Sequence, residues 1–310
     1  MEYLAGYSCQ IFFEKMNNLQ SFNTRQGLFF ISPWIIGLFF FILGPFIASF
    51  ILSFTDYSIL SSPNWVGIKN YKYAFFRDRI FWKSLNVTVQ YVLGSVTLTL
   101  IISFFLALLL NSKIKLKSMW RSVFYLPSIV PLVALSMVWI LVLNPKFGPL
   151  NYLLSLFGID SINWLQNPKT SMLGLIIMSI SWIGVSMIIF LAGLQNISND
   201  MYEAADLEGA TKFQKMLFIT VPIMTPIILF NLIINIIQKF QVFGQIMIMT
   251  QGGPLNSTRV FMLYIFDNAF QYTPAKMGYA CALAWILFMI IFILSIFIFR
   301  TSDKWVFSNE

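Results

Sequence analysis

The stretch "YEAADLEGATKFQKMLFITVPIMTP", residues 202–226, decides the organisation of this chain because it joins a cluster of acids to a long apolar run. With Asp200 just ahead of it, it places four carboxylates within residues 200–208, a third of the chain's 12 acidic residues. Strong helix formers fill its first part, Gly209 interrupts them, and a second helical pattern runs up to Pro222. We therefore predict a helix, a glycine break and a second helix that leads into a membrane.

Capping residues support both helices of this loop. Asp200 and Glu203 stand three apart, which predicts a capping box at the start of the first helix, and Thr211 is placed to cap the second. A helix this short is marginal in water and normally gains its stability from packing, which favours docking on a partner. The alternative is a solvated connecting helix whose acids keep the loop soluble.

The composition is that of a polytopic membrane protein. The 310 residues are 58% hydrophobic and only 10% charged, whereas soluble domains carry roughly a quarter charged residues. Histidine is absent and there are only two cysteines, which excludes imidazole catalysis and the usual transition-metal sites. The formal charge of +8 fits lysines and arginines at membrane boundaries rather than nucleic-acid binding. We expect no cofactor or metal in this chain.

Six charge-free windows are long enough to cross a bilayer, which takes about 20 apolar residues. We predict an all-α integral membrane protein with a cytoplasmic N-terminal tail at 1–27 and a cytoplasmic C-terminal tail at 301–310. Met16 is an alternative natural start to Met1. The membrane domain is expected over residues 28–300, with spans at about 28–53, 87–110, 122–143, 172–194, 220–243 and 279–299.

The charges between the predicted spans favour one orientation only weakly. An even number of spans puts both termini on the same side as the loops at 111–121 and 195–219, and the first of these loops is rich in lysine. The segment 54–85 is also basic, so the full count is ten basic residues on the terminal side against nine on the other, with Lys239 left in a span.

Amide side chains mark a candidate substrate path along the fifth predicted span. Asn231, Asn235 and Gln238 are spaced four and three apart and share one helical face, and Gln241 and Gln245 extend the polar set. Buried amides need a partner or a water-filled cavity, and their donors and acceptor suit sugar hydroxyls. The alternative is that they hold helices together.

Four other side chains lie near the predicted path. Lys239 interrupts the apolar run, and we expect its amine to extend toward the outer membrane surface. Trp182, Trp285 and Tyr264 either stack on sugar rings or pack between helices, which is the commoner use of aromatic residues in membranes.

The opening stretch resembles the EAA loop of binding-protein-dependent ABC importer permeases. That pattern is Glu-Ala-Ala, three intervening residues and Gly, followed by an apolar run to Pro. Here these positions are Glu203, Ala204, Ala205, Gly209 and Pro222. Glu208 stands where the family commonly has Asp, which keeps the charge.

A second stretch resembles the carbohydrate-uptake branch of that family, in particular its first, maltose/glycerol-phosphate-type, permease subunit. Residues 240–285, "FQVFGQIMIMTQGGPLNSTRVFMLYIFDNAFQYTPAKMGYACALAW", follow that branch's glycine-glycine-proline run, its Asn-Ser-Thr and its "MGYASALSW" element. Gln251 replaces the first glycine of the run. The resemblance extends over nearly the whole chain.

This resemblance implies a six-span permease subunit that couples to a cytoplasmic ATPase dimer through the loop. It assigns Glu203 the polar docking contact, Ala204 and Ala205 close packing, and Gly209 the break. It places the 195–219 loop in the cytoplasm of a prokaryotic cell, with the chain in the inner or plasma membrane. No GxxxxGK[ST] loop is present, so a partner must bind ATP and Mg. A second permease chain, an extracytoplasmic solute-binding protein and a sugar, first of all an oligosaccharide, complete the expected system.

Two other classes of membrane protein fit the sequence less well. An ion-coupled secondary transporter of a small polar solute usually needs intramembrane acids or histidines, and the predicted spans contain neither. A membrane enzyme would need clustered acids, bases or metal ligands inside the spans, and the sequence shows none there.

Overall fold

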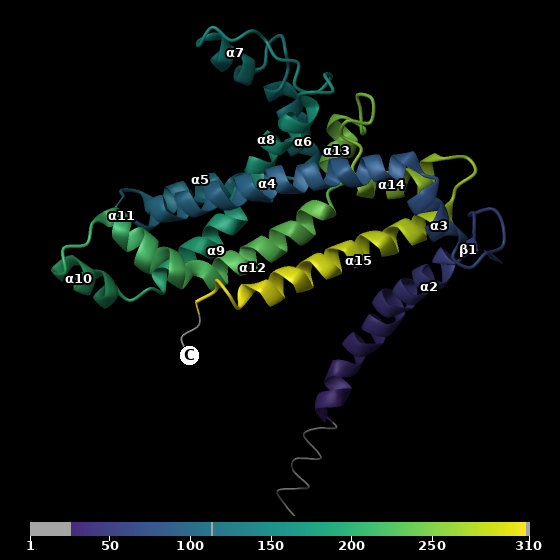
Figure 1. Cartoon of the computed structure of the whole chain (residues 1–310), viewed down its shortest axis with the longest axis horizontal. Helices are drawn as coiled ribbons and strands as arrows, with labels where there is room; N and C mark the ends of the chain where they lie inside the picture. The colour runs from purple at the N-terminus through teal and green to yellow at the C-terminus, as the bar shows by residue number, and fades with distance from the viewer. Residues whose placement is uncertain (1–25, 113, 308–310) are drawn as a thin grey trace, which may run out of the picture.

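The computed structural model describes residues 26–112 and 114–307, and its regular structure is almost entirely helical. Five helices in this part of the chain are long and apolar enough to cross a membrane: Gln26–Ser53, Arg79–Asn111, Ser171–Gln195, Lys212–Phe240 and Met277–Ser302. They lie along an elongated body, with the N-terminal helix inclined away from it (Figure 1). The prediction of an all-α membrane protein is confirmed.

Several of these long helices change their winding along their length. Gln26–Ser53 contains a π-helical segment η1 (Leu38–Leu43) followed by α2 (Gly44–Ser53). Arg79–Asn111 is α4 and Met277–Ser302 is α15. Ser171–Gln195 consists of α8 (Ser171–Met178), the 3-10 turn η2 (Ser179–Trp182) and α9 (Ile183–Gln195). Lys212–Phe240 consists of α11 (Lys212–Lys215), the π segment η3 (Met216–Thr220) and α12 (Val221–Phe240).

The region predicted as one span at 122–143 is a bent pair of helices. α5 (Lys117–Ile129) and α6 (Leu132–Val142) meet at an angle of 102°. Pro131 is the N-cap of α6, and Val130 before it has an extended backbone. Proline has no N–H to continue the helix and disfavours helical geometry in the preceding residue, so the helix ends there. The chain has six spans only if this pair counts as one.

The core is centred on α4, which packs against α9, α12 and α14 (Phe261–Phe266). Tyr91 and Phe190 are among its largest fully buried side chains. Two glycines allow the helices around α9 to approach closely. A Cβ on Gly184 would lie 2.6 Å from the Phe124 carbonyl oxygen, and one on Gly193 would lie 2.1 Å from Ile227. The crossing at Gly184 therefore requires glycine, because the neighbouring atom is backbone, whereas at Gly193 the end of the Ile227 side chain would have to move.

The helix Gln26–Ser53 contributes little to this core. Its most apolar window has no residue buried inside the chain, and its contacts with the body run through α2 against α15. Figure 1 shows its first turns well apart from the other helices. It presents an apolar surface that only lipid or another membrane protein can cover.

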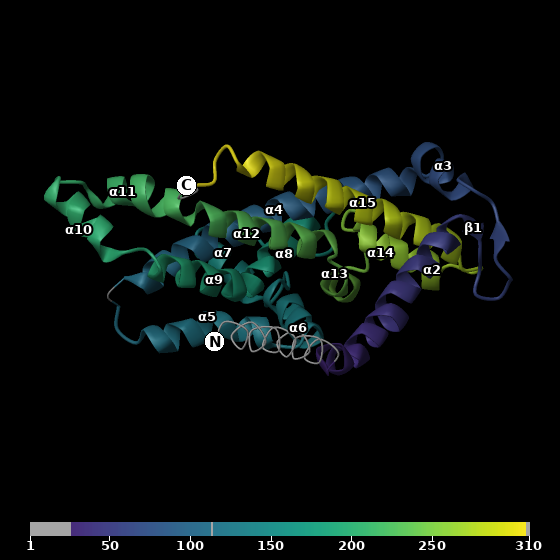
Figure 2. The same cartoon turned by 90° about the horizontal axis from the view of Figure 1, so that it is seen from below.

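Short elements occupy the two ends of the long axis. At one end α10 (Asn199–Leu207) precedes α11, and at the other lie the hairpin β1 (Thr55–Asp56) and β2 (Asn64–Trp65) and the helix α3 (Lys69–Phe76); Figures 1 and 2 agree on this separation. The remaining short elements are α7 (Pro149–Ser155), α13 (Gly244–Met249) and the π segment η4 (Asp267–Gln271).

The predicted tails fall largely outside the described residues. Of the tail at 1–27, residues 1–25 lie outside them, and so do the alternative starts Met1 and Met16. At the other end α15 continues to Ser302, and residues 308–310 lie outside the described part of the chain.

Candidate functional site

The acidic loop folds as a helix, a glycine break and a second helix. α10 ends at Leu207, and Gly209 follows with φ +77°, the left-handed conformation that favours glycine. Thr211 then caps α11 in a capping box with Gln214, in which each side chain bonds the other residue's backbone N–H. The loop conformation is therefore set by residues within the loop itself.

The cap of the first helix differs from the prediction. Ser198, not Asp200, is the N-cap of α10, and its hydroxyl accepts a hydrogen bond from the Asp200 N–H at 3.3 Å. Asp200 and Glu203 thus lie inside the helix and do not form its capping box. Asp200 in the first turn still interacts favourably with the helix dipole. The Glu203 side chain is consequently not committed to the backbone of its own helix.

Most of the predicted coupling residues face outward. Glu203, Ala204, Glu208 and Gly209 are exposed and Ala205 is half-buried. Leu207 beside them is 91% exposed, and Met201 and Phe213 are exposed too, each with a large apolar side chain. The result is a protruding surface that combines small residues, carboxylates and uncovered apolar groups. Such a surface has the chemistry of a docking site.

Two side-chain contacts fasten α10 to the long helix that follows. The hydroxyls of Tyr202 and Thr220 are 2.9 Å apart, and the Asp206 carboxylate forms a salt bridge with Lys215. Tyr202 and Asp206 belong to α10, whereas Thr220 and Lys215 belong to the first turns of Lys212–Phe240. The loop and this helix are thereby held as one unit.

A polar cavity of about 460 Å³ lies at the far end of the same helix, between α9, α12 and α13. It brings together all four of the predicted path residues, Asn235, Gln238, Gln241 and Gln245. Its other polar lining residues are Ser186, Asn231 and Lys239.

The four amides in this cavity have different surroundings. Asn235 is buried, and its amide donates to the Ser186 hydroxyl at 3.0 Å and to the Asn231 carbonyl oxygen at 2.9 Å. Gln245 donates to the Tyr91 hydroxyl at 3.2 Å. Gln238 and Gln241 are exposed and have no such bonds within the described residues. Asn235 therefore joins α12 to α9, while Gln238 and Gln241 are available to a ligand.

Lys239 lies in the wall of this cavity, whereas the sequence led us to expect an amine that extends to the outer surface. It is 7% exposed, and its amine lies 5.7 Å from the centroid of the Trp182 ring. The other two aromatic candidates pack between elements: Trp285 donates to the Ser49 hydroxyl at 3.2 Å, and the Tyr264 hydroxyl donates to Asp78. Of the three, only Trp182 lines the cavity.

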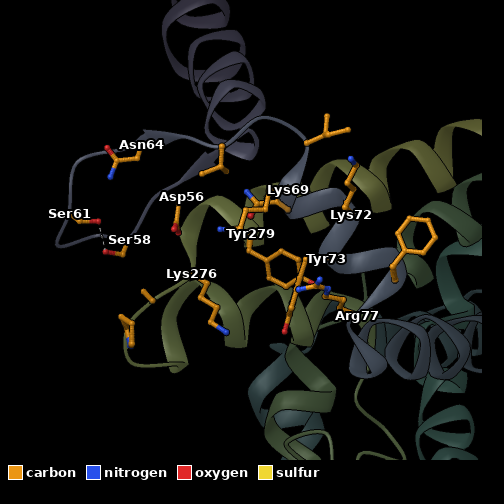
Figure 3. A pocket seen from close by; sticks show the side chains of 16 residues that line it. Asp56, Ser58, Ser61, Asn64, Lys69, Lys72, Tyr73, Arg77, Lys276 and Tyr279 are labelled. Carbon is orange, nitrogen blue, oxygen red and sulfur yellow. Dashed lines mark hydrogen bonds between the residues drawn. The ribbon is translucent and has the colours of Figure 1, made fainter.

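A second, larger hollow, which sequence reasoning missed, lies at the end of the molecule opposite the acidic loop. Its volume is about 1030 Å³, and Figure 3 shows its lining side chains. Asp56 is the one acid of the lining, against the four exposed cations Lys69, Lys72, Arg77 and Lys276. Only the fold reveals this set, because α3 and the segment before α15 are separated by some two hundred residues of sequence.

A buried carboxylate holds Tyr279, one of the residues that line this hollow. Asp78 caps α4 by accepting from the N–H groups of Ile80 at 2.8 Å and Phe81 at 3.1 Å, and its other oxygen accepts from the hydroxyls of Tyr264 and Tyr279. The carboxylate thus joins α4, α14 and α15. No group of three or more potential metal ligands occurs in residues 26–112 and 114–307.

Known proteins resemble this chain over most of its length. The family described as "binding-protein-dependent transport system inner membrane component" matches residues 99–305. The probable ABC transporter permease protein YesP of Bacillus subtilis is 43% identical over 288 residues, covering 92% of both chains. The trehalose/maltose transport system permease protein MalF of Thermococcus litoralis is 30% identical over 270 residues, covering 86% of this chain and 90% of that one.

Solved structures agree on the fold. A chain from a bacterial ABC transporter involved in the import of the acidic polysaccharide alginate superposes with a TM-score of 0.79 at 23% identity, covering 93% of this chain and 99% of that one. The family match spans well over half of the 310 residues, and both relatives align over most of their own length. This chain therefore belongs to the family of binding-protein-dependent transport system inner membrane components.

Proposed function

We propose that this chain is a permease subunit of an ATP-driven sugar importer and forms half of the translocation pathway. The observation that carries the proposal is the continuity of Lys212–Phe240, which begins at the exposed EAA-type loop and ends at the amide-lined cavity. Its 29 residues correspond to roughly 40 Å at about 1.5 Å per residue. A displacement of the loop is thus transmitted to the cavity by one continuous helix.

The loop is the proposed contact with the cytoplasmic ATPase. Glu203 supplies the polar docking contact, Ala204 and Ala205 permit close approach, and Gly209 lets the second helix turn back. Glu208 adds to the acidic surface. The Tyr202–Thr220 bond and the Asp206–Lys215 ion pair would pass the movement of α10 into the long helix. The ATPase dimer binds ATP and Mg, and this chain takes no part in that chemistry.

This assignment fixes the orientation. The loop and both termini are cytoplasmic, the bent pair α5–α6 counts as one of six spans, and the chain resides in a prokaryotic inner or plasma membrane. The basic hollow then faces outward, where a solute-binding protein delivers the sugar. A second structural neighbour is a bacterial alginate transporter in complex with a periplasmic protein that carries an alginate pentasaccharide, which supports such an arrangement.

The remaining partner is a second permease chain. The exposed helix Gln26–Ser53 offers an apolar surface for it or for lipid, and the open cavity needs a facing wall. Relatives named for lactose and for arabinooligosaccharide transport are 30% and 28% identical, which favours a sugar, and an oligosaccharide first. An ion-coupled carrier is not favoured, because the spans contain no acid or histidine.

A charge reversal in the loop tests the proposal. The chain is co-expressed with its partner permease, ATPase and solute-binding protein, and ATP hydrolysis is measured with and without the loaded binding protein. Glu203→Lys should abolish the stimulation, because it puts a cation where the docking contact requires a carboxylate. Asp160→Lys is the matched control, an exposed carboxylate outside the loop. Normal stimulation in Glu203→Lys, or a chain that transports without any ATPase, would refute the assignment.

A further inference from the structure

Lys239 occupies an unusual position for a cation. It lies in the last turn of α12, is 7% exposed and lines the amide cavity. Among the described lysines and arginines it is the one that is buried, whereas the others are exposed or half-buried. A buried ammonium requires an anion to balance its charge.

No anion in the described part of the chain does so. The two salt bridges found there join Lys215 to Asp206 and Arg259 to Asp267, and neither involves Lys239. The cavity lining contains neither Asp nor Glu. Within residues 26–112 and 114–307, the side chain that interacts with the charge is Trp182, whose ring centroid lies 5.7 Å from the amine.

That ring does not compensate for the burial. An unpaired ammonium in a low-dielectric site is strongly disfavoured relative to water, and a cation–π contact offsets only a part of this. A leucine or glutamine would fit the same helix without the unfavourable charge. The lysine therefore contributes something other than stability to the isolated subunit.

The rest of the lining indicates the ligand. Gln238 and Gln241 present free amide donors and acceptors, which suit hydroxyl groups, and Trp182 offers a flat apolar face of the kind on which sugar rings stack. One ammonium matches the single charge of a carboxylate, whereas a phosphate monoester carries about −1.5 to −2. The combination fits a polyhydroxylated ring that bears one carboxylate.

We propose that the transported sugar is a uronate-containing oligosaccharide and that Lys239 neutralises its carboxylate in the translocation cavity. This rests on the proposed function and adds the substrate class. The basic hollow at the outer end, with Lys69, Lys72, Arg77 and Lys276, carries charge of the same sign and would attract the same anionic sugar toward the chain.

The test compares two probes in proteoliposomes that contain the complete transporter. One probe is a labelled oligogalacturonate and the other is its methyl ester, which keeps the hydroxyls and loses the charge. The same solute-binding protein delivers the probes to every variant, and its own affinity for each is measured separately. A difference in uptake between variants then reflects the permease and not the binding protein.

Three variants give the expected pattern. Lys239→Met should lower oligogalacturonate uptake about ten- to a hundredfold, as for loss of a hydrogen bond to a charged group, with a smaller change for the ester. Lys239→Arg should retain most of the uptake. Lys304→Met, the same change at an exposed site outside the cavity, should behave as wild type.

Several results would overturn the proposal. If Lys239→Met took up oligogalacturonate as well as the wild type, the Lys239 charge would have no role in transport. The same would follow if the wild type took up only neutral saccharides. An equal loss for both probes would show instead that Lys239 pairs with a carboxylate of the second permease. A transporter that moves no saccharide at all would refute the proposed function itself, which is a separate outcome.

Discussion

The acidic loop and the amide cavity lie at opposite ends of one helix, yet their structures arise in different ways. The loop folds through its own residues, with Ser198 and Thr211 as caps and Gly209 as the break. The cavity wall combines α6, α9, α12 and α13, and neighbouring helices decide which amides are free. A functional surface made by local sequence can be recognised by residue spacing, whereas one made by packing can be recognised in this way only in part.

The largest expected effect tests the local character of the loop. Proline requires φ near −65°, whereas Gly209 has φ +77°, so Gly209→Pro should rearrange the break at a cost of about 3 kcal/mol or more. Binding-protein-stimulated ATP hydrolysis and uptake should fall about a hundredfold, since ~1.4 kcal/mol corresponds to tenfold.

Gly158→Pro provides the matched control for that variant. Gly158 has φ +75° and, like Gly209, has open space where a Cβ would lie, but it belongs to the α7–α8 connection. An equal loss of coupling in both variants would mean that the effect is general strain, and the distinction between the loop and the rest of the surface would disappear.

The second-largest effect is expected at the wall of the amide cavity, which is formed by helix packing. Asn235→Leu removes both donated hydrogen bonds of a buried amide and leaves the Ser186 hydroxyl without this partner. The free energy of unfolding should fall by about 1–3 kcal/mol, seen as a lower thermal midpoint of the purified complex. A double-mutant cycle with Ser186→Ala should show coupling between the two sites. If the two effects were simply additive, Asn235 would not be coupled to Ser186, and it would count among the amides that are free to bind a ligand.

The smallest effect is expected at the free amides. Gln241→Ala removes one neutral hydrogen-bonding group from the cavity, so uptake should fall about two- to tenfold with an unchanged thermal midpoint. Gln271→Ala, an exposed glutamine at the end of η4, is the control and should leave uptake unaltered. Unchanged uptake in Gln241→Ala would remove this residue from the substrate path.

The long helices and the loop were predictable from the sequence because their signals are local. Charge-free apolar runs specify the helices, and a glycine between two helical patterns specifies the break. The choice of N-cap was not predictable, because Ser198 and Asp200 are both good caps and lie two residues apart. A bend at Pro131 follows from its proline, but its size of 102° was not predictable, because the prolines of other helices, such as Pro226 inside α12, do not end them.

The cavity was predictable only in part. The spacing along α12 brought Asn235 and Gln238 to one wall, as expected for residues three apart on a helix. The use of Asn235 depends on Ser186, far away in the sequence, and the burial of Lys239 depends on Trp182. The basic hollow needs α3 to meet the segment before α15, which no local pattern encodes.

The continuity of Lys212–Phe240 has a consequence for how such chains can change over time. Each residue of an α-helix advances its face by about 100°, so one inserted residue between Thr220 and Gln238 would turn the cavity amides away while the loop stayed in place. The loop and the cavity amides therefore keep a fixed rotation relative to each other about the helix axis. Substitutions can alter either end independently, but insertions and deletions in this helix are tolerated only in steps that restore the turn.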